Sequence, residues 1–228
     1  MTYFLEGLRQ ALKILFPPSR DVLEIVGLSL FVSASATALA AVFAAPLGAF
    51  LALAEFRGRR FLIGLLQTAM AVPAVLIGLV VYILVSRRGL LGFLGLLFTP
   101  GAMILAQALL AFPLIAALTL AALKDKAREG RDLAYALGAS RGRMLLTVVR
   151  QGRFAFLAAM VAGFSRVLGE TGMTLMVGGN IKGATRVMTT AISLETMKGN
   201  FEIGLALGLV LLLTALLVNI VLQWWQGR

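Results

Sequence analysis

Two ionisable residues, Arg166 and Glu170, stand inside an apolar stretch that runs from 154 to 177. Because they are four residues apart, their side chains share one face of a helix. Ionisable groups within a membrane span are costly unless they pair with each other or face water. The spacing therefore predicts an ion pair, with a role either in gating and contact with an anionic solute or only in holding helices together.

The segment that follows, residues 178–192, is rich in glycine, hydroxyl and cationic side chains. Turns of the Gly-Gly-Asn type expose backbone amides, and such amides suit oxyanions. A tetrahedral dianion fits this composition better than a sugar or a peptide. The alternative is a surface turn that docks a solute-binding protein. The candidate solute-contacting residues here are Asn180, Lys182, Thr185, Arg186, Thr189 and Thr190.

A basic polar insert, residues 124–153, separates two apolar stretches. Asp125 or Asp132 can cap the start of a helix and Gly138 can end it. We therefore expect a short helix across the membrane surface that inserts into the groove of a partner. A solvated loop on anionic lipid is the alternative. The candidate partner-contacting residues are Asp132, Leu133, Ala134, Leu137, Gly138, Ala139 and Arg141.

The elements that carry these residues are predicted to be membrane-spanning helices. Of the 228 residues 60% are hydrophobic, against about 45–50% in soluble domains. The chain reads as one all-α transmembrane domain, 1–228, with five spans. Pro46 is expected to kink the first span, and Pro73 and Pro113 fall within the second and third. The expected spans cover residues 22–54, 61–85, 102–123, 154–177 and 201–223.

Residues 1–20 are predicted to form an amphipathic segment, because leucines recur at helical spacing before Pro17 and Pro18. The segment either lies in the membrane interface or packs on the protein's own flank. Lys and Arg residues number twelve on the loops that share the side of the insert and eight on the other loops. Since cytoplasmic loops are richer in Lys and Arg, we expect a multi-pass protein of the cell membrane, with the N-terminus outside and the C-terminus in the cytoplasm.

The sequence excludes several chemistries. It holds no cysteine and no histidine, which removes disulfides, thiolate nucleophiles, Cys/His zinc sites and imidazole acid–base catalysis. It also lacks a Gly-x-x-x-x-Gly-Lys-Ser/Thr phosphate loop. We expect a transport protein rather than an enzyme, without its own cofactor. The net charge is +11, and the Lys and Arg residues that produce it lie beside apolar segments. This position favours contact with lipid over nucleic acid.

Two stretches resemble known families. Residues 132–139, Asp-Leu-Ala-Tyr-Ala-Leu-Gly-Ala, resemble the cytoplasmic Glu-Ala-Ala-x-x-x-Gly loop of ATP-binding cassette (ABC) importer permeases, with Asp for Glu and Leu for the first Ala. The proline that closes that loop in the family is replaced here by Gln151. Residues 163–192, continued by 194–201, are similar to tungstate-type oxyanion importer permeases, and molybdate and sulfate permeases look more distant.

This resemblance implies a type I ABC importer permease core with a cytoplasmic coupling helix, residues 124–153 forming the coupling loop. It implies a homodimer, separate ATPase subunits that bind ATP and Mg, and an extracytoplasmic oxyanion-binding protein. A molybdate or sulfate permease of the same class is an alternative. A carrier from another class, coupled to protons through Glu170, is a further alternative.

Overall fold

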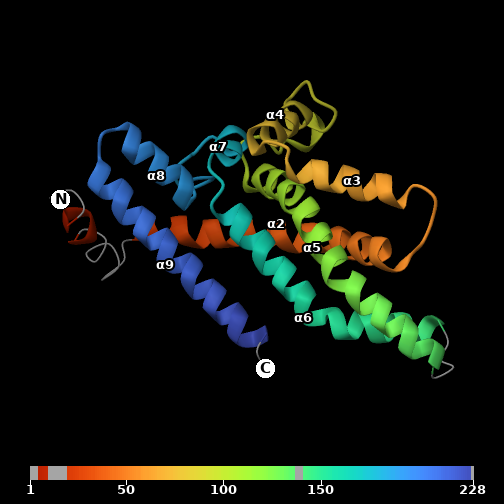
Figure 1. Ribbon diagram of the computed structural model, residues 1–228. Helices are drawn as coiled ribbons and strands as arrows, with labels where there is room; N and C mark the ends of the chain where they lie inside the picture. The colour runs from red at the N-terminus through yellow and green to blue at the C-terminus, as the bar shows by residue number, and fades with distance from the viewer. Residues whose placement is uncertain (1–4, 10–19, 137–140, 227–228) are drawn as a thin grey trace.

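The computed structural model describes residues 5–9, 20–136 and 141–226, and within these ranges every regular element is a helix (Figure 1). Three helices are long and apolar enough to cross a membrane by themselves. Two further pairs of helices meet this criterion jointly, each pair being bent at a short break. The all-α prediction is confirmed, with three to five apolar spans.

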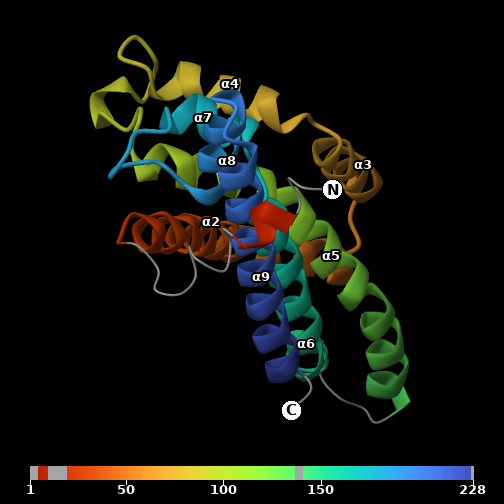
Figure 2. The ribbon, with the colours of Figure 1, turned by 90° about the vertical axis from the view of Figure 1, so that its left-hand side faces the viewer.

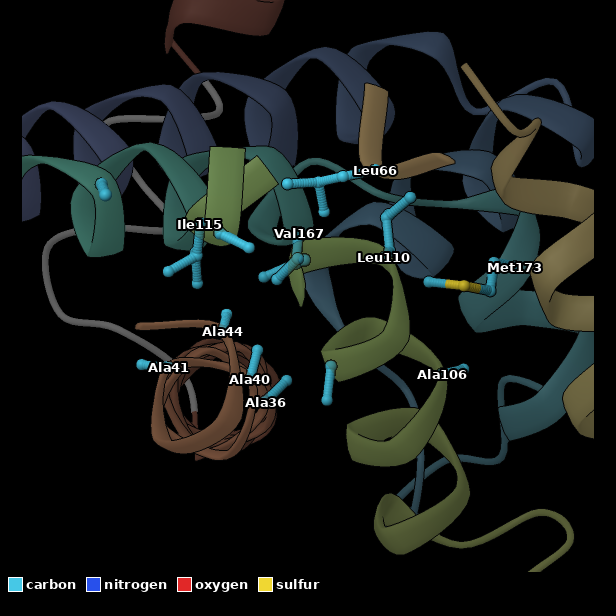
Figure 3. Packing of buried hydrophobic residues seen from close by; sticks show 14 of the residues in the cluster. Ala36, Ala40, Ala41, Ala44, Leu66, Ala106, Leu110, Ile115, Val167 and Met173 are labelled. Carbon is cyan, nitrogen blue, oxygen red and sulfur yellow. The ribbon is translucent and has the colours of Figure 1, made fainter. Parts of the chain in front are cut away.

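The helix α2 (Arg20–Leu53) packs along α5 (Pro100–Ala136). Its buried side is a stripe of small residues at helical spacing, among them Ala36, Ala40 and Ala44, which face Ile115 of α5 (Figure 3). A Cβ atom on Gly48 would lie 2.5 Å from the Ala116 carbonyl oxygen. Small side chains are therefore what allows the two backbones to approach so closely.

The predicted second span is two helices, α3 (Arg59–Met70) and α4 (Ala74–Val85), which meet at 95°. Pro73 supplies the cause, because proline has no N–H group and disfavours helical geometry at the residue before it. Where α2 turns into α3, Gly58 has a φ of 94° and Arg59 Nε donates to the Leu51 carbonyl oxygen at 2.7 Å. That hydrogen bond satisfies one of the carbonyl groups at the end of α2, which have no acceptor role within the helix itself.

The polar insert does not form a helix of its own in the described residues. Residues 124–136 continue α5, and α6 (Arg141–Leu168) begins within the second half of the insert. The prediction of a separate short helix is thus not confirmed. The two helices are joined across the insert by Lys126 Nζ, which donates to the Gln151 carbonyl oxygen at 2.6 Å.

The predicted fourth span is also bent. It comprises α6 and the seven-residue α7 (Gly172–Gly178), which meet at 69°. Part of the segment predicted as a turn is helical, because α8 (Met188–Met197) begins there. The last helix, α9 (Phe201–Gln226), covers the predicted fifth span.

Residues 5–9 are helical and lie against α9. Gly7 is buried there against Leu205, whereas the side chains of Leu5 and Leu8 are exposed. Residues 5–9 thus contact the fold through Gly7, and both alternatives for the N-terminal segment, interfacial or packed on the protein's own flank, stay predictions. The prediction for residues 10–19 lies outside the described residues.

The long helices α5, α6 and α9 run alongside one another, with the insert at one end and α4, α7 and α8 at the other (Figure 2). Contacts between residues distant in sequence connect the elements at the end that carries α4, α7 and α8. Lys182 pairs with Asp21 at 2.5 Å, and the Phe98 amide donates to the Val177 carbonyl oxygen at 3.0 Å. The candidate residues of the fourth span and of the turn after it lie toward this end.

Candidate functional site

Arg166 and Glu170 form the predicted ion pair at the end of α6. The Arg166 Nη1 atom lies 3.0 Å from Glu170 Oε2. The arginine side chain is 46% exposed and the glutamate side chain only 13%. The helix ends at Leu168, so Glu170 belongs to the break between α6 and α7. The cation is thus accessible, while the carboxylate is largely enclosed.

Glu170 connects three helices. Its Oε2 atom binds Arg166 of α6, and its Oε1 atom accepts a 3.5 Å hydrogen bond from the Met173 amide of α7. Its backbone carbonyl oxygen accepts from the Thr189 hydroxyl of α8 at 3.0 Å. Thr171, which precedes α7, makes no side-chain capping bond in the described structure. The carboxylate of Glu170 therefore supplies a side-chain acceptor to the first turn of α7, in addition to the packing of Met173.

The turn between α7 and α8 is held by its own side chains. Asn180 has a φ of 53°, and its Oδ1 and carbonyl oxygens accept from Arg186 at 3.2 and 3.3 Å. Its Nδ2 donates to the Thr190 carbonyl oxygen at 3.3 Å. The Thr185 hydroxyl donates to the Gly178 carbonyl oxygen at 2.5 Å and accepts from the Ile181 amide at 3.0 Å. The turn is thus built before any solute enters it.

The structure brings the predicted solute-contacting residues to one region in two groups. Arg166 and Glu170 form the first group, and the polar residues of the turn between α7 and α8 form the second, with Thr189 as the bridge to Glu170. Thr185, Thr189 and Thr190 are buried and their hydroxyls serve bonds within the fold. Arg166 is the cation that contacts Glu170 at this bridge, and its side chain is 46% exposed.

The predicted partner-contacting residues are placed differently. Asp132, Leu133 and Ala134 lie in the last turns of α5, and Arg141 is the first residue of α6. Leu137, Gly138 and Ala139 lie outside the described residues. Both helices of the insert thus lead directly into the apolar part of the fold.

Sequence reasoning missed several polar contacts around the site. Ser29 of α2 accepts the Met188 amide at 2.8 Å, which fixes the start of α8. Gln107 of α5 donates to the Thr174 hydroxyl of α7 at 3.3 Å, and both side chains are buried. A lone amide in an apolar helix is a signal that could have found Gln107, whereas Ser29 looks like many other small residues of α2.

The end of α8 also holds an acidic group with a shifted pKa. Lys198 and Asn200 donate to Glu195 at 2.8 Å each, and these bonds, the one from Lys198 first, lower the pKa of Glu195 below its ordinary value. Among residues 5–9, 20–136 and 141–226, no group of three His, Cys, Asp or Glu side chains could hold a metal ion.

Comparison with known proteins gives a consistent picture. Residues 44–228 match the family model of the binding-protein-dependent transport system inner membrane component. The chain is 43% identical over 226 residues to the tungstate uptake system permease protein TupB of Peptoclostridium acidaminophilum, covering 99% of both chains. It is 38% identical to TupB of Campylobacter jejuni, covering 97% of this chain and 92% of that one. Identity falls to 27% with the molybdenum transport system permease protein ModB of Escherichia coli, over 88% of this chain and 93% of ModB.

Proposed function

The chain belongs to the binding-protein-dependent transport system inner membrane component family, and we propose that it is the membrane-spanning subunit of an ATP-driven importer of tungstate. The observation that carries this proposal is the 43% identity to a tungstate uptake permease over 99% of both chains. Molybdate and sulfate are the alternative solutes, since their permeases are more distant relatives.

We propose further that two copies of the chain enclose the path and that separate ATPase subunits, which bind ATP and Mg, drive it. The insert supports this part of the proposal, because α5 runs from the apolar core to Ala136 and α6 runs from Arg141 back into the core. A force applied at Asp132 or Arg141 acts on the same helices that carry Gln107 and Arg166. Rigid helices of this kind can transmit movement between distant sites.

For the solute itself, the accessible guanidinium of Arg166 is the group best suited to attract a dianion. Arginine offers several N–H donors in one plane and keeps its charge at all physiological pH values. The outer turn, with Asn180, Lys182 and Arg186, lies between this cation and the end of the molecule where an extracytoplasmic binding protein would dock. The path would then lead from the outer turn past Arg166 toward the cytoplasm, with the N-terminus outside.

The test is uptake by the reconstituted transporter. The permease, its ATPase and the binding protein are placed in vesicles, and accumulation of tungstate is measured with and without ATP, with molybdate and sulfate as competitors. We expect ATP-dependent uptake that tungstate inhibits at the lowest concentration. Transport by the permease alone in a pH gradient would instead favour the proton-coupled carrier that uses Glu170.

A further inference from the structure

We propose that Glu170 occupies the anion site of Arg166 while the path is empty, and that an incoming tetrahedral oxyanion displaces this carboxylate and so releases the joint between α6, α7 and α8. The inference rests on the proposed function and adds a regulatory step to it. In this mechanism the solute opens its own passage, because it competes with a built-in anion.

The competition follows from the chemistry of the two anions. A carboxylate and a tetrahedral oxyanion both accept hydrogen bonds from the planar guanidinium of arginine. Glu170 is linked to Arg166 through one guanidinium nitrogen at 3.0 Å, and 46% of the arginine side chain is exposed. A solute can therefore approach Arg166 before the ion pair breaks, and it can take the place of Oε2 without further rearrangement of the cation.

Displacement matters because of the other contacts of Glu170. The Met173 amide of α7 donates to Oε1 of the same carboxylate, so movement of the side chain removes a restraint on α7 as well. Two glycines flank the bend. A Cβ atom on Gly169 would meet no other atom within 4 Å, whereas one on Gly172 would lie 3.3 Å from the Val75 side chain of α4. The bend is thus open on the side of Gly169, next to Glu170, and packed at Gly172, where α7 begins.

The parts on the two sides of the joint are differently anchored. On one side α7 is packed tightly, since a Cβ on Gly78 of α4 would lie 3.0 Å from the Met173 Cα atom and one on Gly178 would lie 2.8 Å from the Met103 sulfur. On the other side α6 leads back to Arg141 in the insert. Release of Glu170 would therefore remove the ion pair that ties the end of α6 to the start of α7. Since α6 is packed on α5, where a Cβ on Gly163 would lie 2.7 Å from the Ile115 side chain, the change would pass along both helices toward the cytoplasmic end.

Binding of the oxyanion to Arg166 and release of the joint between α6, α7 and α8 are then thermodynamically linked. If the oxyanion must displace the carboxylate, removal of the carboxylate raises the affinity for the oxyanion, and binding of the oxyanion loosens the joint. A purely structural ion pair would show neither effect.

The first experiment measures tungstate binding by calorimetry to the purified permease in lipid nanodiscs, without ATPase or binding protein. We expect Glu170→Gln to bind sodium tungstate about tenfold more tightly than the wild type, within the usual range of coupling between sites, and Arg166→Gln to lose binding. The matched control is Glu24→Gln, which removes the same charge from another Arg–Glu pair of the same spacing, Arg20–Glu24. Its affinity should equal that of the wild type.

The second experiment uses the wild type alone, so it does not depend on the folding of any variant. Hydrogen–deuterium exchange is followed for peptides that cover 169–175. Tungstate should accelerate exchange of the Met173 amide, because displacement of Glu170 removes the Oε1 atom that accepts from this amide.

Equal tungstate affinity of the wild type, Glu170→Gln and Glu24→Gln, or slower exchange at 169–175 with tungstate, would overturn the displacement mechanism. Uptake by the complete wild-type transporter, measured in parallel, separates this failure from that of the proposed function. If ATP-dependent tungstate uptake persists while the displacement tests fail, only the mechanism is wrong. If the wild type neither binds nor imports tungstate, molybdate or sulfate, both proposals fall.

Discussion

At the scale of single residues, the most consequential feature is the pair of Glu170, whose carboxylate is largely buried, and Arg166, whose side chain is exposed. Glu170 is 13% exposed and depends on Arg166 for its countercharge. Removing one partner of such a pair leaves the other desolvated without compensation, which usually costs more than removing both.

We therefore predict that Arg166→Gln lowers the free energy of unfolding by about 1–3 kcal/mol, and that the double variant Arg166→Gln/Glu170→Gln is destabilised less. Thermal unfolding of the three proteins in nanodiscs measures the difference. Equal stability of the single and double variants would mean that Glu170 does not need its partner.

A second residue-scale prediction concerns pH. The pKa of Glu195 is lowered by the bonds from Lys198 and Asn200, so its contribution to stability is present above the ordinary pKa and lost as the pH falls through the lower, folded pKa. The stability difference between the wild type and Glu195→Gln should stay constant from neutral pH down to the ordinary value of 4.5 and shrink below it. Lys198→Met, which removes the largest cause of the shift, should weaken this pH dependence. A difference that grows on acidification would contradict the assignment.

The sequence could reveal the ion pair but not its surroundings. Arg166 and Glu170 stand out because ionisable residues are rare in apolar stretches and four-residue spacing places them on one helical face. The partners of Lys182 and Met188, in contrast, lie 161 and 159 residues away in the chain. No local pattern encodes such distant contacts, so Asp21 and Ser29 could be found only in the folded structure.

At the scale of elements, the two bends differ in how visible they are in the sequence. Pro73 marks the break between α3 and α4, although it does not reveal the 95° angle. No proline accompanies the break between α6 and α7, which lies between Gly169 and Gly172.

The residues after Leu123 differ from both bends, because the apolar segment ends there while the helix continues. Hydropathy marks the end of an apolar segment and does not mark the end of a helix. Residues 124–136 are polar but contain no proline, and α5 continues through them.

The packing of α2 on α5 gives a prediction with an internal control. Gly48→Ala should lower the free energy of unfolding by about 1–3 kcal/mol, because the added Cβ would lie 2.5 Å from the backbone oxygen of Ala116. Gly27, on the same helix, has no atom within 4 Å of such a Cβ, so Gly27→Ala should leave stability unchanged or raise it by up to about 1 kcal/mol. Thermal unfolding distinguishes the two, and equal effects would rule out a close approach of α2 and α5 at Gly48.

The insert is the element on which coupling to an ATPase would depend. Gly138 falls between the end of α5 at Ala136 and the start of α6 at Arg141. Gly138→Pro should abolish uptake while ATP hydrolysis by the assembled complex continues, because proline restricts the backbone where the two helices must respond together. Hydrolysis and uptake are measured on the same vesicles, and membrane insertion of the variant is the control. Normal uptake would exclude this segment from the coupling.

At the scale of the whole molecule, the contacts place the loops at two opposite ends. The loop before α5, the turn after α7 and the start of α2 meet through Phe98–Val177 and Lys182–Asp21. The turn before α3 and both sides of the insert belong to the other end, where Gly152 lies against Leu123. This alternation is what five crossings require, each bent pair counting as one. The positions of the apolar segments could be predicted because hydropathy is summed over long stretches, whereas a bend depends on a few residues.

The absence of cysteine from the chain permits a direct test of this arrangement. Single cysteines at Arg88 and Lys198 should react with a membrane-impermeant maleimide in spheroplasts, whereas cysteines at Arg57 and Lys124 should react only after permeabilisation. All four positions are exposed, so differences in labelling report the side of the membrane. The bent pair α3–α4 is the critical case, because a bend of 95° also fits a segment that enters the membrane and returns. In that arrangement Arg57→Cys and Arg88→Cys would react from the same side. Opposite sides are expected, since the loop that carries Arg88 is bonded through Phe98 to α7 at the far end from the insert.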